Sequence, residues 1–274
     1  MKQYLPYLLL LLLVASCKPS DDGIPAYIHI PTFTVFTTAP IMGSTSHKIT
    51  DVWIYVNDEL QGVYELPVTI PILATGNTKI TFSPGILANG ISTTRVQYPF
   101  YTDTTMLLDL VTGKTDTVLP AITYRSDQFF KLNEDFENGN EFSNLQRVLD
   151  AALAFEGNAC GKIIADTSRI VRVLTTNKIE VNPEFGSVLF MELNYKSTHP
   201  IQAGIIAETD GQGSVVIPKV VIPAQANWNK IYLNFTPEIN GTVANRFRFF
   251  IQIDASGTTD AIEIYLDNVK ILLD

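Results

Sequence analysis

The sequence predicts an all-β protein that consists of two β-sandwich modules. From Tyr27 onward, short runs rich in Val, Ile, Thr, Tyr and Phe are separated by clusters of Gly, Pro, Asn and Asp, which is the pattern of strands and turns. Hydrophobic residues make up 46% of the 274-residue chain and charged residues 17%, which favours packed cores and allows two domains. The composition changes at Tyr124 to Asp127, so we place the modules at residues 27–127 and 128–274.

The first 16 residues are predicted to be a secretion signal rather than part of the fold. Lys2 gives a short positive region, and Leu5 to Ala15 is almost wholly apolar. This run is well short of the ~20 residues that a helix needs to span a hydrocarbon core, so a retained membrane anchor is the weaker interpretation. The run ends in Leu13-Val14-Ala15-Ser16-Cys17, which resembles the bacterial lipoprotein signal.

The resemblance to a lipoprotein signal implies that residues 1–16 are removed and that Cys17 becomes the acylated N-terminus. Acyl chains such as palmitate then anchor the protein to a membrane, and several chains together hold it stably. The alternative is an ordinary secretory signal followed by an unrelated cysteine.

Residues 17–26 are predicted to be a tether, because Lys18 to Gly23 is too polar to pack in a core. A lysine and acidic residues directly after the cysteine resemble the Bacteroidetes lipoprotein export signal. The resemblance implies an outer-membrane lipoprotein exposed on the cell surface, whereas the alternative is an ordinary solvated linker. The formal charge of −9 disfavours nucleic acid as a partner, because the chain has no basic patch.

The chain has only two cysteines, Cys17 and Cys160. If Cys17 carries lipid, Cys160 has no partner within the chain and no structural disulfide can form. Cys160 lies between Ala159 and Gly161, so we expect a small buried side chain rather than a nucleophile.

The first module is predicted to contain closely spaced strands, beginning with the alternating segment Asp51–Val56. Strands separated by Asn-, Asp- or Gly-containing turns are predicted at residues 51–56, 60–64, 68–73 and 79–85. This succession resembles the PEGA-type immunoglobulin-like module over about residues 49–85. The resemblance implies a small β-sandwich that serves as a spacer or an adhesion unit. For Trp53 and Tyr55, packing is favoured over ligand binding.

The second module is predicted to be a larger β-sandwich that begins near Phe129. Its opening, Asn133 to Gly139, and its closing, Ile264 to Ile271, resemble the first and last strands of carbohydrate-binding jelly rolls of the galactose-binding-like superfold. The two ends lie about 130 residues apart, which is typical of that fold. The alternative is a generic β-sandwich.

The jelly-roll resemblance also implies that the terminal strands lie side by side and that acidic residues on them hold a structural calcium ion. The candidate ligands are Asp135, Glu137 and Asp267, which offer the hard oxygen atoms that Ca²⁺ prefers. The alternative is that these acids are solvated or cap turns.

Phe142 to Phe155 is the one segment for which the sequence predicts a helical or coiled element. Apolar residues recur there at helical spacing, at Leu145, Val148, Leu149, Ala152 and Leu153.

Three central strands of the second module can be phased by their apolar residues. The strands around Met191, Leu233 and Phe249 each have one apolar side, which must face the core, and one side that mixes aromatic and polar groups. Aromatic rings can stack on sugars, while carboxylate, amide and guanidinium groups bind hydroxyls. The candidate glycan-binding residues on this mixed side are Tyr232, Phe250, Arg248, Glu192, Asn194, Gln252 and Trp228. Packing remains the alternative for each of them, and it is favoured for Trp228.

Catalysis finds little support in the sequence. His29, His47 and His199 lie far apart without metal-ligand spacing, and no hydrolase or phosphate-binding motif occurs. The leading hypothesis is a non-catalytic lipoprotein, anchored by its N-terminal lipid, that binds a polysaccharide. The rivals are a structural or adhesion subunit that contacts proteins of the envelope and, less favoured, a glycan hydrolase.

Overall fold

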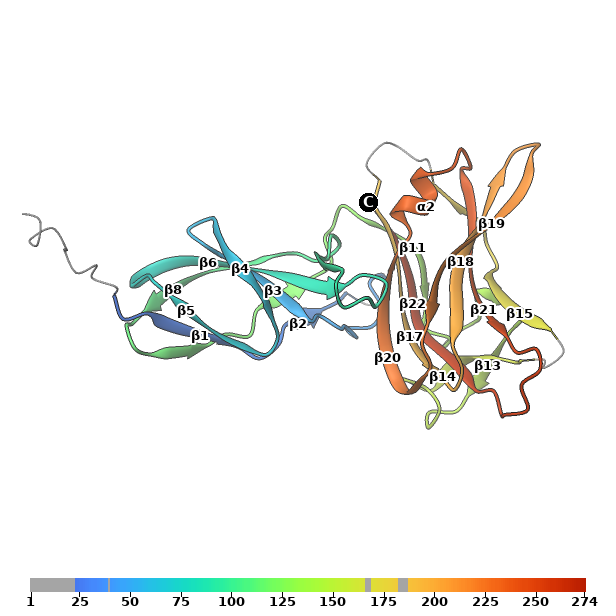
Figure 1. The fold of residues 1–274 in the computed structure, drawn as a ribbon, viewed down its shortest axis with the longest axis horizontal. Coiled ribbons are helices and arrows are strands. Elements are labelled where there is room, and N and C mark those ends of the chain that lie inside the picture. The colour runs from blue at the N-terminus through green and yellow to red at the C-terminus, as the bar shows by residue number, and fades with distance from the viewer. Residues whose placement is uncertain (1–22, 39, 166–168, 182–186) are drawn as a thin grey trace, which may run out of the picture.

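The computed structural model describes residues 23–38, 40–165, 169–181 and 187–274. The predicted signal peptide, Cys17 and most of the predicted tether lie outside these residues. The described chain forms two β-sandwiches, and one end of the N-terminal module meets a sheet face of the C-terminal module (Figure 1). Within that part of the chain, the structure has one short helix, α2 (Thr236–Asn240), and no helix that is long and apolar enough to cross a membrane. The prediction of an all-β fold is therefore confirmed.

The N-terminal module contains ten strands arranged in three sheets. These strands are β1 (Ala26–Ile30), β2 (Thr34–Phe36), β3 (Asp51–Val56), β4 (Glu59–Glu65), β5 (Val68–Ile72), β6 (Gly76–Leu87), β7 (Arg95–Gln97), β8 (Thr104–Leu110), β9 (Thr115–Thr117) and β10 (Ala121–Thr123). The largest sheet has the order β4-β3-β6-β7, with β8 also paired to β6. The smaller sheets are β5-β1-β9 and β10-β2.

Strand β3 shows how the alternating pattern builds the N-terminal module. Val52 and Ile54 are fully buried in its core, while Trp53 and Tyr55 lie on the opposite side of the sheet and are half-buried. The turn between β3 and β4 places Asn57 at a positive φ of 50°, a conformation that asparagine tolerates well. The strands predicted from this part of the sequence are present.

The C-terminal module consists of two six-stranded sheets packed face to face. The near sheet, which faces the N-terminal module, contains β11 (Phe129–Glu134), β13 (Leu145–Leu149), β14 (Ala159–Ile163), β17 (Leu189–Ser197), β20 (Gln225–Asn234) and β22 (Ile264–Leu273). The far sheet contains β12 (Phe142–Ser143), β15 (Ile170–Thr175), β16 (Ile179–Glu180), β18 (Ile201–Thr209), β19 (Gly213–Ile222) and β21 (Arg246–Asp254). The near sheet has the order β13-β14-β22-β17-β20, with β11 on β22. The far sheet has the order β12-β15-β21-β18-β19, with β16 on β21.

The core of the C-terminal module lies between these two sheets. Met191 and Leu233 from the near sheet and Phe249 from the far sheet are fully buried there, as the alternation of their strands predicts. The opening strand β11 pairs antiparallel with the closing strand β22, from Phe129 opposite Leu273 to Glu134 opposite Val269. The terminal strands therefore lie side by side, as the jelly-roll resemblance implies.

The expectation of a helical or coiled element over Phe142 to Phe155 is wrong. This segment forms the short strands β12 and β13, followed by turns. Asn144 separates the two strands with a positive φ of 60°, and β13 pairs along its whole length with β14. Leu149 is exposed, so the apolar residues do not form one buried helical face. Pairing with a distant strand thus overrides the local helical spacing.

The two modules share a packed interface on the outer side of the near sheet. Phe190, Tyr232 and Leu272 of the near sheet join the hydrophobic core of the N-terminal module. The Tyr98 ring of the N-terminal module meets Phe190 edge to face, with 5.4 Å between ring centroids. The backbone N–H of Asn89 donates to the Tyr232 carbonyl over 2.7 Å. Apolar packing and main-chain hydrogen bonds therefore both join the modules.

Candidate functional site

The seven predicted glycan-binding residues lie on two different sheets. Four are on near-sheet strands, namely Glu192, Asn194, Trp228 and Tyr232. The other three are on β21 of the far sheet, namely Arg248, Phe250 and Gln252. Because each set points away from the shared core, the two sets face opposite sides of the module (Figure 1). This corrects the expectation of one shared face, which the sequence cannot distinguish from two.

The near-sheet set is mostly closed off by the N-terminal module. Tyr232, Glu192 and Asn194 are all buried. The Tyr232 hydroxyl accepts a hydrogen bond of 2.9 Å from the backbone N–H of Lys48, and Asn194 Oδ1 accepts one of 3.1 Å from the Ser46 hydroxyl. These side chains therefore bind the N-terminal module, and a polysaccharide cannot reach them in this arrangement.

A buried charge cluster lies at the centre of this interface. Glu192 is 0% exposed, and its carboxylate pairs with Lys230 Nζ at 2.6 Å and accepts hydrogen bonds from the hydroxyls of Tyr98 and Tyr124. Burial opposes ionisation of Glu192, but the charges of Lys230 and Lys270 and these hydrogen bonds outweigh it and hold the pKa of Glu192 below its usual value. The glutamate is therefore a buried anion that links the two modules.

Lys270 completes the charge cluster from strand β22. Its ammonium group donates to the Ser44 carbonyl over 2.7 Å and to the Tyr124 hydroxyl over 3.1 Å. Burial lowers the pKa of Lys270 to about 7, although the negative charge of Glu192 opposes this shift. The mixed polar and aromatic side of the near sheet is thus explained by an internal interface.

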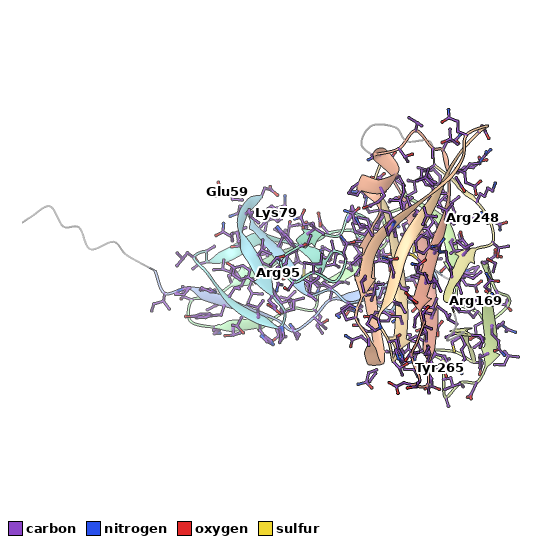
Figure 2. All side chains as sticks on the ribbon, turned by 45° about the vertical axis from the view of Figure 1, so that its right-hand side comes forward. Glu59, Lys79, Arg95, Arg169, Arg248 and Tyr265 are labelled. Atoms are coloured by element: carbon purple, nitrogen blue, oxygen red, sulfur yellow. The ribbon has the colours of Figure 1, made fainter. Side chains whose placement is uncertain are left out.

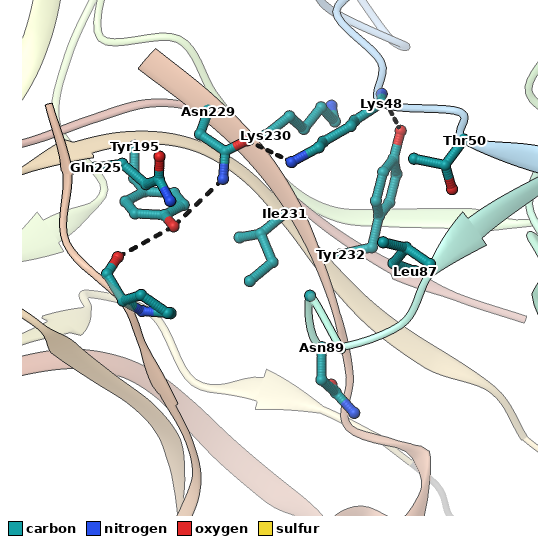
Figure 3. Close-up of a pocket in the computed structure, with 12 residues that line it drawn as sticks. Lys48, Thr50, Leu87, Asn89, Tyr195, Gln225, Asn229, Lys230, Ile231 and Tyr232 are labelled. Carbon is teal, nitrogen blue, oxygen red and sulfur yellow. Dashed lines mark hydrogen bonds between the residues drawn. The ribbon is translucent and has the colours of Figure 1, made fainter. Parts of the chain in front are cut away.

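A small cavity of about 130 Å³ lies at the edge of the interface, beside β20 (Figure 3). Lys48 Nζ donates to Asn229 Oδ1 over 2.6 Å within it, and Asn229 in turn donates to the Tyr195 hydroxyl over 3.3 Å. The cavity is well below the roughly 300–1,000 Å³ of typical ligand pockets. Lys48, Asn229 and Tyr195 bind one another there and join the two modules.

Trp228 is half-buried and contacts two neighbouring side chains. Its ring meets Phe155 edge to face at 5.9 Å between centroids, and the Lys196 ammonium lies 5.4 Å from its ring centroid. Phe155 and Lys196 therefore cover part of the indole ring.

The far sheet turns its outer side away from the N-terminal module, and no described element packs over it (Figure 1). We call its outward side chains the far face. The far face comprises Ile170, Arg172, Leu174, Gln202, Ile206, Glu208, Val216, Arg246, Arg248, Phe250 and Gln252. In Figure 2, Arg248 lies on this side of the molecule, whereas Glu59, Lys79 and Arg95 lie on the N-terminal module.

Phe250 forms the middle of the far face but is 0% exposed. Its ring lies over Gly204 on the neighbouring strand β18, where any Cβ atom would collide with it. The guanidinium group of Arg172 on β15 lies over the same ring, 4.6 Å from the centroid. Phe250 therefore acts as the base on which Arg172 rests and is itself inaccessible to a ligand.

A row of hydrogen-bonded side chains crosses three strands beside Phe250. Arg172 Nε donates to Gln252 Oε1 over 2.7 Å, and Gln252 Nε2 donates to Gln202 Oε1 over 2.6 Å. The backbone register places these three residues directly opposite one another on β15, β21 and β18. Their polar ends are therefore fixed in one line across the face.

The other end of the far face carries ion pairs. Glu208 lies 3.2 Å from Arg248 Nη2 and 2.5 Å from Lys178 Nζ, and Arg246 pairs with Asp210. Hydrogen bonding to Lys178 holds the pKa of Glu208 below its usual value, although burial opposes this shift. Arg248 is thus committed to an ion pair.

A hollow of about 400 Å³ adjoins the polar row. Its size lies within the range of pockets that hold small ligands, which is roughly 300–1,000 Å³. It is lined by Ile170, His199, Pro200, Ile201, Gln202, Val221, Gln252 and Asp254. Amide, imidazole and carboxylate groups there can exchange hydrogen bonds with hydroxyls, and the aliphatic side chains can pack on C–H surfaces.

Arg172, Gln202 and His199 were not among the residues predicted from the sequence. The alternation Val171-Arg172-Val173 is a signal that Arg172 points outward. That signal does not say which strand lies beside β15, so the row of side chains can be recognised only from the strand pairing.

The three predicted calcium ligands do not converge in this structure. Asp267 Oδ2 accepts a hydrogen bond of 2.9 Å from the Phe155 N–H, and Glu137 Oε1 accepts one of 2.7 Å from the Asn158 N–H. Asp135 accepts one of 3.0 Å from the Glu137 N–H. Across the described ranges, no group of three His, Cys, Asp or Glu side chains is placed to hold a metal ion. The carboxylates serve backbone donors, so this arrangement does not fit a calcium site.

No protein family matches the chain, and no curated protein matches it. Among solved structures, it is similar to the CBM22-1 xylan-binding domain from Paenibacillus barcinonensis Xyn10C, with 13% identity, a TM-score of 0.41, and 53% of this chain and 94% of that chain covered. It is also similar to the C-terminal family 22 carbohydrate-binding module of Clostridium thermocellum Xyn10B, with 11% identity, a TM-score of 0.38, and coverage of 52% and 91%. A third is the family 11 carbohydrate-binding module from Clostridium thermocellum in complex with a β-1,3-1,4-mixed-linked tetrasaccharide, with 13% identity, a TM-score of 0.37, and coverage of 53% and 94%.

Proposed function

We propose that the protein is a non-catalytic, lipid-anchored surface protein that binds a polysaccharide through the far face. The observation that carries the proposal is the row of Arg172, Gln252 and Gln202, fixed by hydrogen bonds beside a hollow of about 400 Å³ on a sheet face that no described element covers. Side chains that are already held in place lose little conformational freedom when a ligand binds. Such a row suits a ligand with many hydroxyl groups.

The chemistry of the far face favours recognition by hydrogen bonds over stacking on aromatic rings. Phe250 is fully buried, so it offers no open ring surface to a sugar. The amide groups of Gln202 and Gln252 each provide donors and acceptors, and Val221 and Ile170 supply aliphatic contacts in the hollow. This combination favours a polar ligand over an apolar one.

The absence of catalysis is part of the proposal. Glycoside hydrolysis generally requires two carboxyl groups about 5 to 9.5 Å apart across the substrate. Of the described residues that line the hollow, Asp254 alone carries a carboxylate. The backbone N–H of Ser256 donates to that carboxylate over 3.1 Å, so Asp254 is engaged at the start of a loop.

Membrane anchoring through Cys17 places this binding face at a cell surface. The chain enters β1 at the end of the N-terminal module that lies farthest from the C-terminal module (Figure 1). The N-terminal module then acts as a spacer between the anchor and the far face. Metabolic labelling with a palmitate analogue tests the anchor: the parent incorporates label and Cys17→Ala does not, and an unlabelled parent would refute it.

Glycan binding is tested by affinity electrophoresis against a panel of neutral and acidic polysaccharides. We expect the parent to be retarded by at least one of them and Gln252→Ala to bind about tenfold more weakly, since each hydrogen bond contributes about 1 kcal/mol and more than one is lost. Gln97→Ala is the matched control, because Gln97 lies on the N-terminal module, where it donates to the Tyr55 hydroxyl. A parent that binds no polysaccharide, or a Gln252→Ala variant that binds as well as the parent, would overturn the proposal.

A second candidate function is protein contact within an envelope complex. Leu60, Val63 and Leu107 are exposed on the outer side of the largest N-terminal sheet, beside the half-buried rings of Trp53 and Tyr55. Exposed apolar side chains gathered on one face favour a protein partner. This function predicts a stoichiometric partner in crosslinked envelopes that is lost with Val63→Asp, while polysaccharide binding is absent.

A further inference from the structure

We propose that the far face selects acidic polysaccharides, and that Arg172 binds the carboxylate of a uronic acid unit. The inference rests on the proposed function, because it names the class of glycan that the far face would take. It is carried by the position and the partners of one guanidinium group.

Arg172 is held in place without a neutralising partner. Its guanidinium group lies 4.6 Å from the Phe250 ring centroid, and its Nε donates to Gln252 Oε1 over 2.7 Å. These two contacts fix the plane and one edge of the group. Among the described residues, no carboxylate pairs with Arg172, so its terminal nitrogens are free to donate.

Five other arginines of the described residues are each engaged by a carboxylate or by backbone carbonyls. Arg95, Arg125, Arg246 and Arg248 each pair with a carboxylate. Arg147 instead donates to the backbone carbonyls of Phe136 and Glu137. The sequence contains 28 acidic residues and has a formal charge of −9, so carboxylates are plentiful. An arginine left without one on an open face, on strand β15 beside the central strand β21, is therefore suited to an anion from outside.

The shape of the group favours a carboxylate in particular. A guanidinium group donates two parallel hydrogen bonds to a carboxylate, a geometry that an ammonium group cannot match. Because Phe250 and Gln252 already fix Arg172, little side-chain freedom is lost on binding. The adjoining amides of Gln252 and Gln202 lie in position for the hydroxyl groups of the same chain of sugars.

Two carboxylates on the far side of the module, those of Glu208 and Asp254, are each engaged by partners other than Arg172. Glu208 is neutralised by Arg248 and Lys178 at the opposite end of the face. Asp254 lines the hollow two residues beyond Gln252 on β21, and its carboxylate accepts a hydrogen bond of 3.1 Å from the Ser256 N–H. Arg172 is thus the cation that an incoming carboxylate would meet without competition from an existing ion pair.

The test compares acidic polysaccharides with their own neutral forms. Polygalacturonate, alginate, hyaluronan and glucuronoxylan are each measured before and after chemical reduction of the carboxyl groups, which preserves the backbone and removes the charge. We expect the parent to bind at least one acidic polymer about tenfold to a hundredfold more tightly than its reduced form, the range for hydrogen bonds to a charged group. Arg172→Gln should abolish this ratio, and Arg172→Lys should restore only part of it.

The ratio between the two forms of a polymer separates recognition from folding. A variant that merely destabilises the sheet weakens binding to both forms and leaves the ratio unchanged, which would overturn the role of Arg172. Arg125→Gln is the matched control, because Arg125 pairs with Asp127 at the module boundary. If the parent binds acidic and reduced forms equally, or only neutral polymers, the inference fails while the proposed function stands. If no polysaccharide binds, the proposed function itself fails.

Discussion

Replacement of Glu192 by Gln tests whether the charge cluster holds the two modules together. The substitution keeps the size of the side chain and an oxygen acceptor for the hydroxyls of Tyr98 and Tyr124. It removes the negative charge that lies 2.6 Å from Lys230 Nζ, at a position that is completely buried. The experiment therefore isolates the ion pair from the packing around it.

The expected loss of stability is large because the remaining charge cannot reach water. Removal of one partner of a buried ion pair typically destabilises a protein by about 3–5 kcal/mol. Glu192→Gln leaves Lys230 buried without its anion, and Lys270 of the same cluster, whose pKa of about 7 makes it only partly charged at pH 7, loses the same anion. We expect the free energy of unfolding to fall by about 3–5 kcal/mol at pH 7.

Urea unfolding followed by tryptophan fluorescence measures this loss. Trp53 reports on the N-terminal module and Trp228 on the C-terminal module, so Trp228→Phe and Trp53→Phe backgrounds give a separate signal for each. The control is Asp58→Asn, which removes an exposed ion pair with Lys79, whose side chains are 71% and 42% exposed; we expect it to cost less than about 1 kcal/mol. If Glu192→Gln costs no more than this control, the buried pair does not stabilise the interface and the reasoning is refuted.

Two further predictions concern titration and metal binding. Burial lowers the pKa of Lys270 to about 7 in the folded protein, whereas the pKa of an unfolded lysine is about 10.4. Between these two values the unfolded chain therefore binds one more proton at Lys270 than the folded chain does. The free energy of unfolding of the parent should consequently rise from pH 7 to about 10. Urea unfolding at pH 7 and 9 should show a gain of about 2 kcal/mol relative to Lys270→Met, and equal gains in both proteins would contradict it. For calcium, we expect the melting temperature to be the same with calcium and with EGTA, since the carboxylates of Glu137 and Asp267 accept backbone N–H donors. A melting temperature that falls by several degrees in EGTA and recovers with calcium would instead support the structural calcium ion predicted from the sequence.

Much of the strand pattern could be predicted from the sequence because it is local. Strict alternation places Val52 and Ile54 in one core and Met191 and Leu233 in the other, since successive side chains of a strand point to opposite sides. The segment around Leu145 shows where a local pattern does not determine the structure. There the helical spacing of apolar residues is also local, but pairing of β13 with β14 determines the structure.

The interface could not be predicted because the signal for it is the same as that for a ligand site. An outward side with Glu192, Asn194 and Tyr232 has the residue types of a sugar-binding face, and it also has those of a polar domain contact. The distinction depends on Tyr98 and Tyr124, which lie roughly 70 to 90 residues earlier and reach the same carboxylate. No periodicity within β17 or β20 carries that information.

Because the outer side of the near sheet is buried against the N-terminal module, the far face is the outer sheet face of the C-terminal module that a polysaccharide could reach. A β-sandwich has two outer faces, and the near sheet uses its own to bind the N-terminal module. The far sheet keeps Arg172 and Gln252 aligned on the opposite side, away from β1, where the chain leaves the proposed anchor (Figure 1). If the interface around Glu192 holds the modules rigidly, the far face is directed away from the membrane. The interface that contains Glu192 and Lys230 buries Tyr232, so that Tyr232 cannot bind a glycan. The same interface would then fix the direction in which the far face points.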